Sequence, residues 1–190
     1  MSTVEDLKNR APQGFGVTVE TLTPTDQDIR VLSAQLGRTV RDVIEIPARC
    51  VCGNPLVAAT APRLSNGNPF PTVFYLAHPA ITAAASRLEA GGLMYEMTDA
   101  LAADTELANR YTLAHENYLA ERERIRLISG TDEVPEIENI SAGGMPTRVK
   151  CLHALLGHSL AAGAGVNPIG DRTLEALRER GLWDPERCSC

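Results

Sequence analysis

The chain has 190 residues and a mass of 20.4 kDa, with 44% hydrophobic and 22% charged residues, which is typical of one globular domain. Its 18 basic and 24 acidic side chains give a net charge of −6 and a pI near 5.2, which argues against nucleic-acid binding and against a polybasic membrane anchor. The sequence has neither a secretory signal nor an apolar run long enough to span a bilayer, so we expect a cytoplasmic protein.

The first helix is predicted after a loosely organised N-terminal segment. Prolines and glycines interrupt residues 1–25, which we expect to form a flexible extension or one edge strand. Thr25 or Asp26 can cap a helix in which apolar residues recur at helical spacing up to Leu36. Gly37 is well placed to end this helix.

Three short strands are predicted next. Residues 40–48 are rich in β-branched side chains, residues 55–60 follow a Cys-x-Cys-Gly turn, and residues 72–76 follow an Asn-Gly-Asn-Pro turn. Turns between successive short strands favour a small, mainly antiparallel sheet.

Residues 80–127 are dominated by good helix formers. The pair Gly91-Gly92 should separate the first two helices of this segment, and Asp104 can cap the third. The order of elements predicts an α+β fold of about three strands packed against several helices, with the helices on one face of the sheet. We assign a single domain to residues 26–183 and a Cys-x-Cys tail to residues 184–190.

Two more helices are predicted near the C-terminus. After a loop at residues 129–145, Pro146 occupies a favoured first-turn position for a helix that runs to about Ala162. Asp171 is expected to cap a last helix that ends at about Arg180.

Five cysteines are unusual in a protein expected in a reducing compartment, and four of them fall in two Cys-x-Cys pairs. Thiolates select zinc or an iron–sulfur cluster over hard cations, although one residue between the cysteines is fewer than in usual zinc motifs. We therefore predict a zinc or iron–sulfur site with Cys50, Cys52 and Cys151 as ligands, completed by Cys188, Cys190 or His158.

The helix predicted over residues 146–162 carries two histidines. Cys151 and His158 are expected opposite its apolar stripe, about 10 Å apart along the axis, which is too far for both to chelate one ion. His153 and His158 are candidates for proton transfer, against the alternative that both are structural. Because no catalytic triad, nucleophile elbow or dinucleotide fingerprint is present, the sequence does not predict a particular enzyme.

A different interpretation is a site for phosphate, a nucleotide or another small anion. Two glycines before a helix N-terminus let backbone N–H groups approach an anion, and nearby basic side chains would add charge. Its candidate residues are Arg63, Gly143, Gly144, Arg148 and Lys150. A third interpretation is an interaction module whose cysteines are incidental, which would act through a protein partner.

The sequence also resembles an uncharacterised bacterial family, the domain of unknown function 501. The resemblance covers about residues 27–183 and is most specific in the block from Gly143 to His153. It implies no known activity. The matching residues are Arg49-Cys50, Cys52-Gly53-Asn54-Pro55, Pro62-Arg63-Leu64, Gly67-Asn68-Pro69-Phe70-Pro71-Thr72, Phe74-Tyr75-Leu76, Arg87-Leu88-Glu89, Ala114-His115, Tyr118-Leu119, Gly143-Gly144-Met145-Pro146, Arg148-Val149-Lys150-Cys151-Leu152-His153, His158 and Asn167-Pro168-Ile169-Gly170-Asp171.

Overall fold

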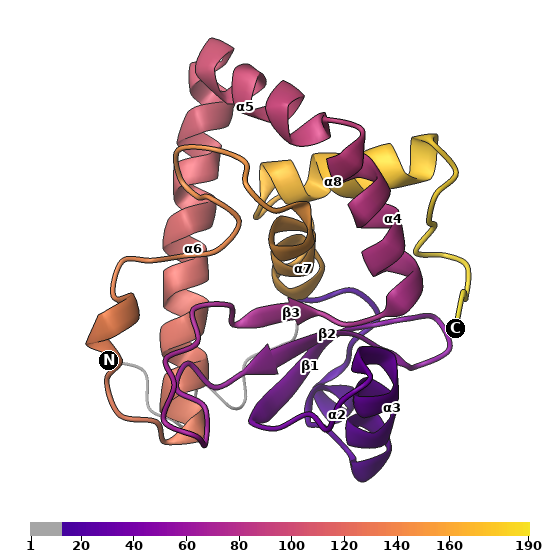
Figure 1. The fold of residues 1–190 in the computed structure, drawn as a ribbon, viewed down its shortest axis with the longest axis vertical. Helices are drawn as coiled ribbons and strands as arrows, with labels where there is room; N and C mark the ends of the chain where they lie inside the picture. The colour runs from indigo at the N-terminus through magenta and orange to yellow at the C-terminus, as the bar shows by residue number, and fades with distance from the viewer. Residues whose placement is uncertain (1–12) are drawn as a thin grey trace.

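The computed structural model describes residues 13–190, and it confirms an α+β fold with a three-stranded antiparallel sheet in the order β1-β2-β3 (Figure 1). The strands are β1 (Val43–Arg49), β2 (Pro55–Thr60) and β3 (Phe74–Leu76). The helices are α2 (Val19–Leu22), α3 (Asp26–Leu36), α4 (Pro79–Ala90), α5 (Leu93–Ala103), α6 (Thr105–Ser129), α7 (Leu152–Ala162) and α8 (Pro168–Glu179), with a 3₁₀ turn η1 (Pro135–Ile137).

Helix α7 is the centre of the fold (Figure 1). Nine of its eleven residues are buried, including Leu152, Leu155, Leu156 and Leu160, so the helix is enclosed on all sides rather than along one stripe. It packs closely on β3 at Gly157, where an added Cβ would lie 3.3 Å from the Phe74 carbonyl oxygen. Helices α4, α6 and α8 surround it, which leaves the sheet to cover its remaining side.

The sheet is covered on both faces, which corrects the prediction of helices on one face only. The face toward α7 contributes residues such as Val57 and Phe74 to the main core. The opposite face packs against α3, where Leu32 meets Ile46 and Ala58 in a separate, smaller cluster. A sheet with two apolar faces needs two covering layers.

Several helix ends agree with the local signals in the sequence. Thr25 caps α3 by accepting the backbone N–H of Asp28, and Gly37 ends this helix in a left-handed conformation. Asp104 caps α6 by accepting the N–H of Leu107. These predictions succeed because each cap depends on residues within three or four positions of itself.

The predicted helix start at Pro146 is wrong, because α7 begins only at Leu152. The preceding residues fold into consecutive turns, in which the Gly143 carbonyl accepts the N–H groups of Lys150 and Cys151. The last helix, by contrast, begins earlier than predicted. Asn167 caps α8 through the N–H groups of Ile169 and Gly170, so the predicted Asn-Pro-Ile-Gly turn is the first turn of the helix.

The remaining differences concern the first residues of two strands and the N-terminal segment. Strand β2 has the predicted bounds, whereas β1 begins three residues later and β3 two residues later than expected. Residues 1–12 of the predicted extension lie outside the described residues. Residues 13–25 pack on the domain: the Phe15 N–H donates to the Leu160 carbonyl, and its carbonyl accepts the Arg49 N–H.

No helix among residues 13–190 has the length and apolarity needed to cross a membrane.

Candidate metal centre

The first part of the candidate centre is the tight turn between β1 and β2. The Cys50 N–H donates to the Asn54 carbonyl, and the Gly53 N–H donates to the Cys50 carbonyl, each over 2.8 Å. Gly53 has a φ of 90°, a conformation that side chains other than glycine rarely adopt. The closed turn places the Cys50 and Cys52 side chains on one side of the hairpin end.

Arg49 holds this turn against the rest of the domain. Its buried guanidinium donates to the Gly53 carbonyl at 2.9 Å and forms a bidentate ion pair with Asp28 of α3, at 2.6 and 3.0 Å. Burial opposes ionisation of Asp28. The hydrogen bonds from Arg49 and Thr25, together with the positive charge of Arg49, outweigh burial and lower the pKa of Asp28 to about 2. The turn is therefore held in place by contacts that involve no cysteine sulfur.

The second part of the centre is the C-terminal tail, which descends from α8 to the end of the sheet (Figure 1). Trp183 is buried, and its indole N–H donates to the Ser189 hydroxyl at 3.2 Å, which fixes the course of the tail. As a result, Cys188 and Cys190 reach the turn that carries Cys50 and Cys52. The four sulfur atoms all lie within 4.8 Å of one another, and Cys52 Sγ is 3.2 Å from Cys190 Sγ.

The surroundings of the thiols favour ionisation of one of them. A hydrogen bond from the backbone N–H of Asn54 lowers the pKa of Cys52 to about 7, whereas burial raises the pKa of Cys50. His78 lies beside the group with Nε2 3.0 Å from Cys190 Sγ. Burial lowers the pKa of His78, and its Nδ1 has no hydrogen-bond partner among residues 13–190. The sequence offered no pattern that links His78 to residue 190.

Cys151 and His158, the other two predicted ligands, are not in the four-cysteine group. Cys151 precedes α7 and lies with Glu89 and His153, their ligand atoms within 4.8 Å of one another. His153 Nδ1 is 3.0 Å from Glu89 Oε1, and Nε2 is 3.1 Å from the Thr82 carbonyl oxygen. The neighbouring Cys151 and Glu89 raise the pKa of His153 to about 9. Glu89 was not predicted as a site residue, although it belongs to a stretch that carried the family resemblance.

His158 is fully buried in the core. Its ring stacks on Phe74 and meets Tyr118 edge-on. Nε2 donates to Asn117 Oδ1 at 2.9 Å, and Nδ1 accepts from Asn167 Nδ2 at 3.1 Å. Both ring nitrogens are satisfied by neutral amides, and burial lowers the pKa of His158 to about 3. The arrangement suits a neutral structural histidine.

This burial predicts a specific acid sensitivity. The folded pKa of about 3 lies below the ordinary value of 6.5, so the stability due to neutral His158 is present above pH 6.5 and is lost as the pH falls toward 3. We expect His158→Gln to remove about 2 kcal/mol of the decrease in unfolding free energy between pH 7 and pH 5. Urea unfolding of the wild type and of His158→Gln at both pH values measures the two decreases in unfolding free energy. Equal decreases in both proteins would contradict the prediction.

The residues predicted to bind an anion are only partly close together. Gly143 and Gly144 do not open a helix, and their lack of side chains is explained by packing: a Cβ on Gly143 would lie 2.5 Å from Leu155 Cδ2. Arg148 and Lys150 are exposed in the turns before α7. Arg63 forms an ion pair with Glu136 at 2.7 Å and also donates to the Gly67 carbonyl. Anion binding at this loop stays a prediction.

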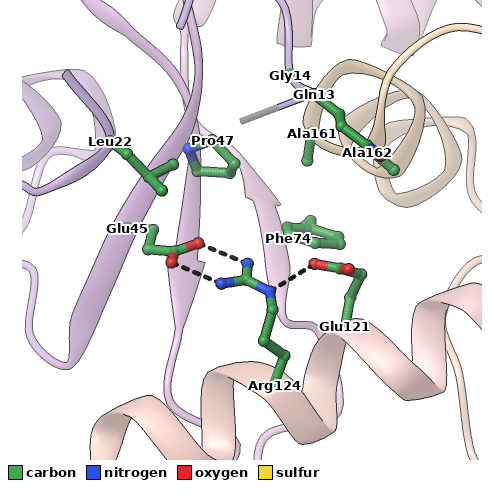
Figure 2. A pocket seen from close by; sticks show the side chains of 10 residues that line it. All are labelled: Gln13, Gly14, Leu22, Glu45, Pro47, Phe74, Glu121, Arg124, Ala161 and Ala162. Atoms are coloured by element: carbon green, nitrogen blue, oxygen red, sulfur yellow. Dashed lines mark hydrogen bonds and ion pairs between the residues drawn. The ribbon is translucent and has the colours of Figure 1, made fainter. Parts of the chain in front are cut away.

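A further polar cluster lies between β1 and α6 (Figure 2). The Arg124 guanidinium forms ion pairs with Glu45 at 2.6 Å and with Glu121 at 2.9 Å, and all three side chains are at most 10% exposed. The adjoining cavity is about 30 Å³, enough for a water molecule and too small for a substrate. The cluster is therefore a structural element.

One protein family matches the chain over more than half of its length. No curated protein and no solved structure matches it significantly. The family described as "protein of unknown function (DUF501)" matches residues 46–175, more than half of the chain. This match includes Cys50, Cys52 and the group around Cys151, and it ends before the tail that carries Cys188 and Cys190. The chain belongs to this family, as the sequence motifs predicted.

Proposed function

We propose that the protein binds one zinc ion through Cys50, Cys52, Cys188 and Cys190, and that this ion fastens the C-terminal tail to the β1–β2 turn. The observation that carries the proposal is the convergence of four thiols, from positions far apart in the sequence, within 4.8 Å of one another. Four protein ligands close the coordination sphere, and closed thiolate sites are typically structural.

The size of the group favours a single ion over an iron–sulfur cluster. A tetrahedral zinc ion with Zn–S bonds of about 2.3 Å holds its sulfurs roughly 3.8 Å apart. The four thiolates of an iron–sulfur cluster are shared among more than one iron, so the inorganic core separates at least some of them. Sulfur separations below 4.8 Å therefore fit one tetrahedral ion better.

Two features outside the ligands support the same proposal. The Asn54 N–H lowers the pKa of Cys52, as expected of a backbone group that stabilises a metal-bound thiolate. His78 offers Nε2 to Cys190 Sγ at 3.0 Å, and an imidazole N–H at this position would donate to a thiolate ligand. Both contacts would offset the negative charge of a four-thiolate centre.

Metal analysis of protein purified without a metal-affinity tag tests the proposal. We expect Cys52→Ser and Cys190→Ser each to lose about one equivalent of zinc relative to the wild type. Cys151→Ser is the matched control, because it removes a thiol outside the group, and after Co²⁺ exchange it should keep the spectrum of a four-thiolate centre. Iron with sulfide in place of zinc, or the same zinc content in Cys190→Ser as in the wild type, would overturn the proposal.

A further inference from the structure

We propose a second metal site, in which Cys151 Sγ, His153 Nδ1 and one Glu89 carboxylate oxygen bind a divalent cation of the zinc type and leave a coordination position open to solvent. The three ligands come from two elements, with Glu89 on α4 and the other two at the start of α7. This site shares no ligand with the four-cysteine centre and does not depend on it.

The spacing of the ligand atoms fits a single small ion. The sulfur, nitrogen and oxygen atoms lie within 4.8 Å of one another, and Nδ1 is 3.0 Å from Glu89 Oε1. A tetrahedral zinc ion with bonds of about 2.0–2.3 Å to such ligands would hold them roughly 3.3–3.6 Å apart. Small adjustments of the side chains would therefore admit the ion.

The contacts behind the ligands orient them toward a common point. His153 Nε2 lies 3.1 Å from the Thr82 carbonyl oxygen, which only accepts, so Nε2 carries a proton and Nδ1 faces Glu89. A metal-binding histidine usually donates its second ring N–H to a carbonyl or carboxylate in this way. Glu89 Oε1 is itself held by the Leu152 N–H at 2.7 Å, as expected of a ligating carboxylate.

Charge and exposure also suit a cation. Carboxylate, thiolate and imidazole groups are the ligands that zinc binds in proteins, and the negatively charged ones offset the charge of the ion. The His153 and Glu89 side chains are 24% and 23% exposed, so solvent reaches the site. Three protein ligands with an open position are typical of zinc sites that bind water or a substrate.

Cobalt titration of a variant that lacks the four-cysteine centre tests this site separately. In Cys188→Ser/Cys190→Ser, we expect about one equivalent of Co²⁺ to bind with a thiolate charge-transfer band roughly a quarter as intense as that of a four-thiolate centre. Adding Cys151→Ser should abolish the band. Glu89→Gln should weaken binding by about tenfold or more while keeping a side-chain oxygen for the Leu152 N–H.

Circular dichroism of each variant controls for folding. Failure of the folded double variant to bind Co²⁺, or a band that survives Cys151→Ser, would overturn the second site without affecting the four-cysteine proposal. Loss of zinc from the tail variants with retention of this cobalt band would support both. Azide should shift the visible cobalt bands of the double variant, and unchanged bands would contradict the open position.

Discussion

Replacing Arg124 by methionine is expected to lower the free energy of unfolding by about 3–5 kcal/mol. Arg124 lies between Glu45 and Glu121, and the three side chains are at most 10% exposed (Figure 2). The substitution preserves most of the volume but removes the cation that pairs with the buried Glu45 carboxylate. A buried charge that loses its partner costs far more than the pair contributed when intact.

Arg126→Met is the matched control for this variant. It removes the same side chain from the same helix, but Arg126 pairs with the half-exposed Glu123, so we expect a loss of at most about 1 kcal/mol. Urea unfolding at neutral pH measures both variants. Similar losses in the two proteins would mean that the Arg124 network is no more important than a surface ion pair.

The fold was most predictable where local contacts decide it. Thr25 and Asp104 cap their helices through residues three positions away, and β2 has its predicted bounds. Pro146 carried an equally good local signal, yet the backbone there folds into turns closed on the Gly143 carbonyl. The close packing of Gly143 against Leu155 is a tertiary contact that no spacing rule in the sequence expresses.

The candidate site, like the fold, was predictable from the sequence only in part. The two Cys-x-Cys pairs indicated a thiolate site, and the structure brings these four cysteines together. The sequence also grouped Cys151 with Cys50 and Cys52, because chemistry alone cannot say which of five thiols meet. Which thiols join Cys50 and Cys52 depends on the course of the tail after Trp183, which is fixed by burial and by a hydrogen bond to Ser189.

Zinc removal is expected to lower stability substantially and to release the tail. If the ion binds only the folded protein, free zinc at a thousand times its dissociation constant adds about 4 kcal/mol to the free energy of unfolding. For a chain of this length, that corresponds to a decrease in melting temperature of roughly 8–16 °C on chelation. Cys188→Ser/Cys190→Ser with Cys151→Ser added, which lacks both proposed metal sites, should melt near the temperature of the chelated wild type and should not respond to chelator.

The single tryptophan of the chain reports the position of the tail. Trp183 is buried and bonded to Ser189 one residue before Cys190, so release of the tail should shift its emission to longer wavelength. Ser189→Ala is the control, because it removes this hydrogen bond but keeps all four thiols and should keep the zinc-dependent stability. A melting temperature that falls without any change in Trp183 emission would place the stabilising ion away from the tail. Since the core around α7 includes Trp183 but no residue beyond it, the domain itself should remain folded after the ion is lost.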